Sequence, residues 1–107
     1  MAKQEIDKES LLPFVEIDRV IHEPARLLIL AILSMIECAD FLFLMNQTQL
    51  TRGNLSSHLS KLEAAGYVEI QKEFVEKIPR TLLRLTEKGK KAFAEYRQKM
   101  QRVLDSF

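Results

Sequence analysis

This sequence contains few of the residues on which disulfide-bonded or loop-rich proteins depend. Its 107 residues include one cysteine, Cys38, no tryptophan, three glycines and three prolines. A single thiol cannot form an intramolecular disulfide, which excludes a disulfide-stapled secreted domain and favours a reducing compartment. With 47% hydrophobic and 29% charged residues, the composition is typical of one globular domain with a buried core.

Long hydrophobic runs and a secretory leader are missing as well. The sequence does not start with a basic segment followed by an apolar one, as a signal peptide does. The most apolar run, residues 27–36, is interrupted by Ser34 and is far shorter than the ~20 residues that span a bilayer. The sequence therefore predicts a cytoplasmic protein without a membrane partner.

The formal net charge of +1 conceals an uneven distribution of charge. Residues 1–50 carry four basic and eight acidic side chains, whereas residues 51–107 carry twelve basic and seven acidic ones. A basic half can present a basic surface to a polyanion. Charge alone favours the simpler interpretation, in which these side chains are spread over solvated helix surfaces. The positions of the basic residues must therefore decide between the two.

Hydrophobic spacing predicts two helices in the first third of the chain. After a polar, frayed start at residues 1–9, apolar residues at helical spacing indicate a helix over 10–21. Pro24 suits the first position of a second helix, residues 24–36. That helix is apolar on nearly every side, which is typical of a central, buried helix. The apolar block at 41–45 fits either a strand or a short helix.

A third clear helix follows a turn-like segment at residues 46–50. Thr51 is a good N-cap for a helix over 52–65, and Gly66 is a good residue to end it. The buried side of this helix is predicted to be a narrow apolar stripe of Leu55, Leu59 and Leu62.

The hydrophobic period then changes from helical to alternating. Residues 67–71 and 80–85 alternate as half-buried strands do, and residues 74–79 connect them as the long tip of a β-hairpin. Thr86 is placed to cap a last helix over 87–107. This order predicts a mainly α fold with a small β-hairpin (α+β class): a single winged helix-turn-helix domain spanning residues 1–107, in which the hairpin is the wing.

The outer side of the predicted helix 52–65 is small, polar and almost free of acids. At about 100° per residue, Glu63 falls nearer the apolar stripe, and the outer face carries Gly53, Asn54, Ser57, Ser60, Lys61 and Ala64. Small residues let a helix enter the major groove, and Asn, Ser, Arg and Lys contact base edges or phosphates. An ordinary solvated helix surface is the alternative.

Two further groups of residues are weaker candidates for DNA contact. His58 lies near the edge of the apolar stripe, where a packing role is more common than contact with a base. Lys72, Lys77 and Arg80 flank the predicted hairpin tip and could straddle a phosphate backbone, but neighbouring Glu73 and Glu76 weaken their field.

Three segments carry a resemblance to a known family. Residues 53–68 read GNLSSHLSKLEAAGYV, residues 79–81 and 85–89 read PRT and LTEKG, and residues 21–26 read IHEPAR. As a set, these segments resemble the short winged-helix transcriptional regulators of the MarR/ArsR-like group of bacteria and archaea. The resemblance covers about residues 18–100.

The resemblance implies a homodimer that places two recognition helices in successive major grooves, with wings at residues 72–80 reaching backbone or minor groove. The helix contacts that it implies by position are Arg52, Asn54, Ser56, Ser57, His58 and Lys61. The sequence departs from the family in its wing, FVEKIPR, which has no tip glycine and two acids. The Cys-x-Cys motif of metal-sensing members is absent, so metal sensing of that type is disfavoured and no cofactor is expected.

Both ends of the chain carry apolar stripes that a small hairpin cannot cover. The helical spacing of 3, 4, 3 and 4 in the last helix is that of a helix–helix seam. We therefore predict a dimer interface built from the helices at 10–21 and 87–107, with Phe14, Ile17, Val20, Phe93, Tyr96, Met100, Val103 and Phe107. The alternative is that both helices pack on their own chain.

These features predict a sequence-specific regulator of transcription that binds double-stranded DNA, and they favour a repressor over an activator. The alternative is a winged helix used only for contact with other proteins. An enzyme is disfavoured, because no glycine-rich phosphate loop and no cluster of metal-ligand residues is present. A small-molecule effector of unknown chemistry remains open as a partner; the apolar residues at the chain ends favour a filled core over a ligand pocket.

Overall fold

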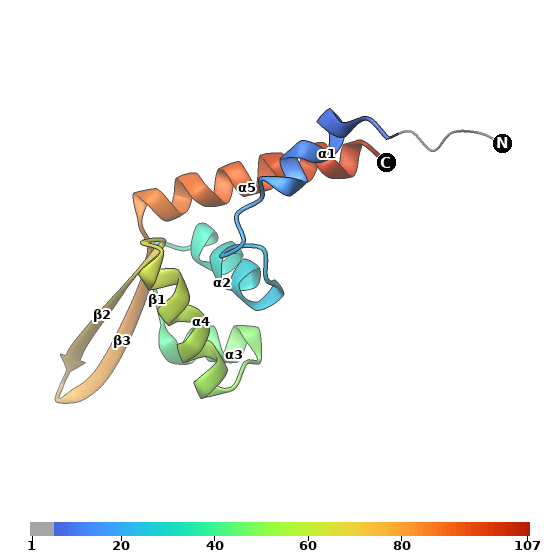
Figure 1. The fold of residues 1–107 in the computed structure, drawn as a ribbon. Helices are drawn as coiled ribbons and strands as arrows, with labels where there is room; N and C mark the ends of the chain where they lie inside the picture. The colour runs from blue at the N-terminus through green and yellow to red at the C-terminus, as the bar shows by residue number, and fades with distance from the viewer. Residues whose placement is uncertain (1–5) are drawn as a thin grey trace.

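A long C-terminal helix and a protruding hairpin define the shape of the molecule (Figure 1). The computed structural model describes residues 6–107, without the side chain of Ser10. The elements are α1 (Lys8–Val15), α2 (Pro24–Met35), β1 (Ala39–Asp40), α3 (Phe41–Thr48), α4 (Arg52–Ala64), β2 (Val68–Val75), β3 (Ile78–Leu85) and α5 (Glu87–Asp105). Helix α1 lies along the C-terminal half of α5, at the opposite end from the hairpin, and the molecule measures 71 × 26 × 22 Å.

The sheet is antiparallel with the strand order β1-β3-β2. Val68 pairs with Leu85 and Ile70 pairs with Leu83, so these four side chains share one face. Val68, Leu83 and Leu85 are buried. The base of the hairpin is therefore part of the core, and the rest projects from it as the predicted wing.

Helix α2 is central, but one of its sides is open. Ile29, Leu30 and Leu33 are buried in the core, as expected for a strongly apolar helix, yet Leu28 and Met35 are exposed. The prediction that α2 is buried on nearly every side is therefore wrong for one face. Helices α3 and α4 and strand β3 pack against α2, but they leave the side with Leu28 and Met35 uncovered.

The N-terminal helix differs from the predicted range of 10–21. It begins at Lys8, because the Asp7 carboxylate accepts a hydrogen bond from the N–H of Glu9, and it ends at Val15. Residues 8 and 9 are therefore helical, while the first five residues of the predicted frayed start lie outside the described part. The segment between α1 and α2 is a linker that turns at Asp18, whose carboxylate accepts hydrogen bonds from the N–H groups of Val20 and Ile21.

The ambiguous block at residues 41–45 is helical. The Asp40 carboxylate accepts a hydrogen bond of 2.7 Å from the N–H of Phe43 and caps α3. The helix runs on to Thr48, so the prediction of a turn over residues 46–50 is wrong for its first part. Gln49, with φ of 60°, ends α3 in the left-handed conformation.

The tip of the wing is shorter than predicted. The strands continue through the Phe74–Pro79 and Val75–Ile78 pairs, and only Glu76 and Lys77 form the turn. Both turn residues have positive φ, 52° and 68°, as in the type I′ turns that join twisted strands. Pro79 and the charged pair Glu76–Lys77 are typical of loops, but Phe74, Val75 and Ile78 favour strands and extend the ladder to the turn.

Helices α4 and α5 begin at the predicted caps. Thr51 Oγ1 accepts a hydrogen bond from the N–H of Asn54, and Thr86 Oγ1 accepts one from the N–H of Gly89. Gly66 follows α4 with φ of +81°, a conformation that glycine adopts without strain. These local signals fix both ends of the segment that carries the wing.

Candidate nucleic-acid interface

Helix α4 has one buried side and one broad exposed side. Leu55, Leu59 and Leu62 are at most 2% exposed and anchor the helix in the core. The residues predicted for DNA contact on the exposed side are Arg52, Asn54, Ser56, Ser57 and Lys61, and the structure leaves all of them exposed. The narrow apolar stripe thus frees most of the helix surface for a ligand.

One acid borders this surface. Glu63 is exposed and lines a groove beside the wing. At about 100° per residue it falls between Leu59 and Ser56 around the helix, next to the apolar stripe, as the spacing predicts. The face is therefore nearly, rather than fully, free of negative charge.

A groove of about 980 Å³ separates α4 from the wing and the start of α3. It brings together residues of α4, β2 and β3 that were predicted for DNA contact: Arg52, Ser56, Lys72 and Arg80. The guanidinium of Arg52 also lies 5.4 Å from the centre of the Phe41 ring. Stacking on this ring holds the cation at the groove while leaving its N–H groups available.

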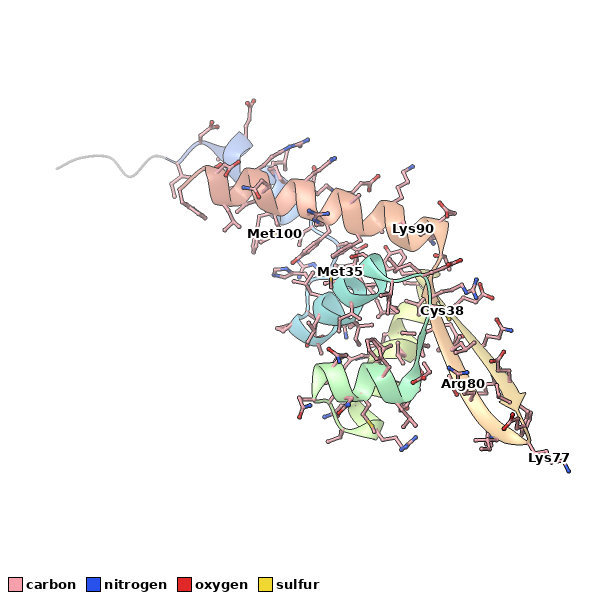
Figure 2. The ribbon with its side chains drawn as sticks, turned by 180° about the vertical axis from the view of Figure 1, so that it is seen from behind. Met35, Cys38, Lys77, Arg80, Lys90 and Met100 are labelled. Carbon is pink, nitrogen blue, oxygen red and sulfur yellow. The ribbon has the colours of Figure 1, made fainter. Side chains whose placement is uncertain are left out.

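The wing presents its basic residues unevenly. Figure 2 shows Lys77 at the far tip of the hairpin and Arg80 nearer the body of the domain. Arg80 lies 3.5 Å from the Asp40 carboxylate, and both side chains are partly exposed. Such surface pairs are weak, so Arg80 can exchange this carboxylate for a phosphate. Lys77 does not line the groove.

Apolar side chains at the wing tip were not singled out from the sequence. Phe74 is 76% exposed, Ile78 is 65% exposed, and Val75 lies beside them. They lie on the two strands directly next to the Glu76–Lys77 turn. The tip of the wing thus exposes apolar side chains next to charged ones.

His58 points toward α2 and away from the exposed face of its helix. Its side chain is only 20% exposed, and its Nδ1 lies 3.2 Å from Nη1 of Arg26 and 3.5 Å from Oε2 of Glu23. Burial raises the pKa of Glu23, but the N–H groups of Arg26 and Ala25 and the positive groups nearby outweigh it, so the pKa is lowered overall. The prediction that His58 contacts DNA stays a prediction, and its surroundings favour the packing alternative.

The comparisons with known proteins agree with this geometry. A family model described as a winged helix DNA-binding domain matches residues 25–104. The chain belongs to this family of winged helix DNA-binding domains.

A curated but uncharacterised protein of Methanocaldococcus jannaschii is 37% identical over 78 residues, which are 73% of this chain and 85% of that protein. Among solved structures, a transcriptional regulator homologue from Pyrococcus horikoshii is 29% identical with a TM-score of 0.82, covering 91% of this chain and 95% of that one.

The PcaV transcriptional regulator from Streptomyces coelicolor, solved with its natural ligand, shares the fold at 19% identity and a TM-score of 0.71, over 92% of this chain and 68% of that one. The winged-helix fold class and the resemblance to winged-helix transcriptional regulators are therefore confirmed.

Polar contacts that the sequence did not reveal join the linker of this winged helix domain to α5 and to the segment between α4 and β2. The Tyr67 hydroxyl donates to the Asp18 carboxylate, and Nδ1 of His22 lies 2.9 Å from the Tyr96 hydroxyl. Burial, the hydrogen bond to Asp18 and the negative charges of Asp18 and Glu95 raise the pKa of Tyr67 to about 12. Burial also raises the pKa of Tyr96. Both phenols thus stay protonated donors at neutral pH.

The terminal helices of the winged helix domain bury some of the predicted interface residues within the chain itself. Ile17, Phe93, Tyr96 and Val103 are buried, and Val20 and Met100 pack partly against the core. An uncovered apolar surface is nevertheless present beside them: Leu12, Phe14 and Val15 of α1, and Leu104 and Phe107 at the end of α5. The dimer interface stays a prediction, and the outward residues are its best candidates.

No helix in the described part of the winged helix domain is both long and apolar enough to cross a membrane. Within residues 6–107, no three His, Cys, Asp or Glu side chains are grouped closely enough to hold a metal ion.

Proposed function

We propose that this winged helix protein is a homodimeric repressor that acts in the cytoplasm, binds double-stranded DNA sequence-specifically and reads an inverted repeat through α4. The observation that carries the proposal is the exposed face of α4, where Arg52, Asn54, Ser57 and Lys61 are held outward by the buried leucines on the opposite side. Amide, hydroxyl and cationic side chains of this kind donate to base edges and phosphates in the major groove. Repression would follow from covering a promoter.

The groove beside α4 supports the same proposal. A helix that enters the major groove brings the neighbouring phosphate backbone against its flank. Arg52, Lys72 and Arg80 line that flank from three different elements. Their cationic groups can therefore fix the orientation of the domain while α4 reads bases.

The randomised-duplex experiment tests sequence reading directly. Purified protein would be incubated with randomised duplex DNA at near-physiological salt, and the retained DNA would be sequenced. We expect an enriched inverted repeat whose half-sites are about one helical turn, ~34–36 Å, apart. The absence both of enrichment and of salt-sensitive retention would overturn the DNA-binding proposal, because phosphate contacts make binding fall steeply with salt.

Dimerisation predicts a mass twice the 12.4 kDa of one chain in size-exclusion chromatography with light scattering. Phe14→Glu should yield monomers, since it places a charge on the uncovered apolar surface of α1 and α5. Phe74→Glu is the matched control, because Phe74 is an exposed phenylalanine at the far wing. A wild-type monomer, or equal loss of dimer in both variants, would contradict the interface.

A protein-contact module without DNA binding is the second candidate, and the apolar wing tip favours it. Phe74 and Ile78 are strongly exposed at the wing tip, and exposed apolar surface can mark a contact with another protein. In that case the protein would retain no duplex in the selection. A small-molecule effector stays a prediction for this chain; the Streptomyces regulator was solved with its natural ligand.

A further inference from the structure

Three polar side chains connect the recognition helix to the start of α2. Arg26 donates from Nε to the backbone carbonyl of Val20 and from Nη1 to Nδ1 of His58, at 3.2 Å. Glu23 caps α2 by accepting a hydrogen bond of 2.9 Å from the N–H of Arg26, and its Oε2 lies 3.5 Å from Nδ1 of His58. His58 is thus the group on α4 that meets this capping site.

The site is attached to a rigid part of the fold. Ile29 and Leu30, in the helical turn that follows Arg26, are completely buried in the core. Arg26 also fixes the linker through Val20, whose own N–H is bonded to Asp18. A change at His58 therefore alters the side-chain contact that joins α4 to this part of the fold.

The imidazole of His58 has two ways of using these neighbours. A guanidinium only donates, so Nδ1 must accept when it faces Arg26, which requires the neutral ring with its proton on Nε2. A protonated Nδ1 cannot accept and would instead donate to the carboxylate of Glu23. Imidazole is the side chain that exchanges these forms between about pH 5 and 8.

The charges around His58 favour a contact with Glu23 once the ring is protonated. Arg26 and Glu23 face it from α2, and Lys61 lies three residues later on its own helix. Asp18 is engaged with Tyr67 and with the linker backbone. Protonation therefore adds a cation beside the guanidinium of Arg26, and Glu23 is the acceptor within reach.

We propose that His58 is a positioning residue that orients α4 through Arg26, and that protonation of its Nδ1 transfers the contact to Glu23 and weakens sequence discrimination. The proposal rests on the proposed function, since it concerns how α4 reads bases. Hydrogen bonds to base edges depend on donor–acceptor distance and angle and carry the sequence information, whereas phosphate contacts carry none. A rotated α4 thus loses specific affinity and keeps non-specific affinity.

The test compares two DNA probes across pH. The probes are the duplex enriched by selection and a scrambled duplex of equal length and composition, each titrated with the full chain between pH 5.5 and 8. For the wild type we expect the ratio of the two affinities to fall about tenfold on acidification, near the lower end of the loss when one base contact is misaligned. If acidification acted only by adding positive charge, the affinity for both probes would rise instead.

His58→Asn separates positioning from packing. The asparagine oxygen can occupy the place of Nδ1 and accept from Arg26 at every pH, so this variant should keep the high ratio and lose its pH dependence. His22→Asn is the matched control: it removes the other histidine, which faces Tyr96, and should keep the wild-type profile. A flat wild-type ratio, or a His58→Asn ratio that still falls with pH, would overturn the proposal.

A measurement without DNA separates this proposal from the proposed function. Nitrogen shifts of the His58 ring should report an unprotonated Nδ1 at pH 8, and backbone amides of α4 should shift with the same midpoint as the ring. A proton on Nδ1 at pH 8 would overturn the positioning role, and so would α4 amide shifts that do not change during the pH titration. If the selection enriches no sequence while these shifts behave as expected, the proposed function fails and the contact between His58 and Arg26 stands.

Discussion

Replacing Arg52 and Lys61 together by alanine is expected to abolish detectable binding to the selected duplex at near-physiological salt. Both side chains are exposed on α4, Arg52 at its first residue and Lys61 near its last turn. A base contact contributes about 1–3 kcal/mol of discrimination, and each phosphate contact contributes about 0.9 to the slope of log affinity against log salt. The affinity should fall about 100-fold or more, and the salt slope should fall by about 1–2.

The matched control removes the same charge elsewhere. Lys91 and Arg97 are exposed on α5, away from the groove between α4 and the wing. Their double alanine variant has the same net charge as Arg52→Ala/Lys61→Ala and should bind within a few-fold of wild type. Undiminished binding by the α4 variant would exclude α4 as the reading helix. Equal losses in both variants would show that net charge, rather than position, governs affinity.

Features that depend on neighbouring residues could be predicted from the sequence. The threonine caps of α4 and α5, the buried stripe of Leu55, Leu59 and Leu62, and the left-handed Gly66 all follow from patterns within one or two turns. The outward residues of α4 followed from the same stripe. Such patterns suffice to define the exposed face of α4, because the buried side of a helix determines its exposed side.

Features that depend on distant partners could not be predicted. Residues 41–45 have no decisive period, and their helix begins because Asp40 caps it beside a strand that pairs with β3. His58 and Arg26 are 32 residues apart, and Tyr67 and Asp18 are 49 apart. An Asp before a turn is a recognisable signal for Asp18, but nothing local reveals that Tyr67 shares it. The orientation of α4 is therefore a property of the tertiary fold.

Gly89→Ala is expected to cause a large loss of stability, because α5 passes very close to the chain between α4 and the wing. A Cβ at this position would lie 2.1 Å from the backbone oxygen of Tyr67 and 2.9 Å from its carbonyl carbon. Neither atom can move freely, since the Tyr67 oxygen accepts a hydrogen bond from the N–H of Thr86, and the Thr86 hydroxyl bonds Gly66. The first turn of α5 must therefore shift away from the sheet.

The steric contact, rather than helix propensity, decides whether Gly89→Ala raises or lowers the free energy of unfolding. Alanine favours a helix interior over glycine by about 1 kcal/mol, whereas overpacking costs about 1–3 kcal/mol, and more where backbone must move. We expect the free energy of unfolding to fall by about 2 kcal/mol in urea denaturation at a fixed protein concentration. Gly53→Ala is the control, because a Cβ there meets nothing within 4 Å, and it should not destabilise. A Gly89→Ala protein as stable as wild type would contradict the tight approach of α5 to Tyr67, and with it the coupling of α5 to the segment that carries the wing.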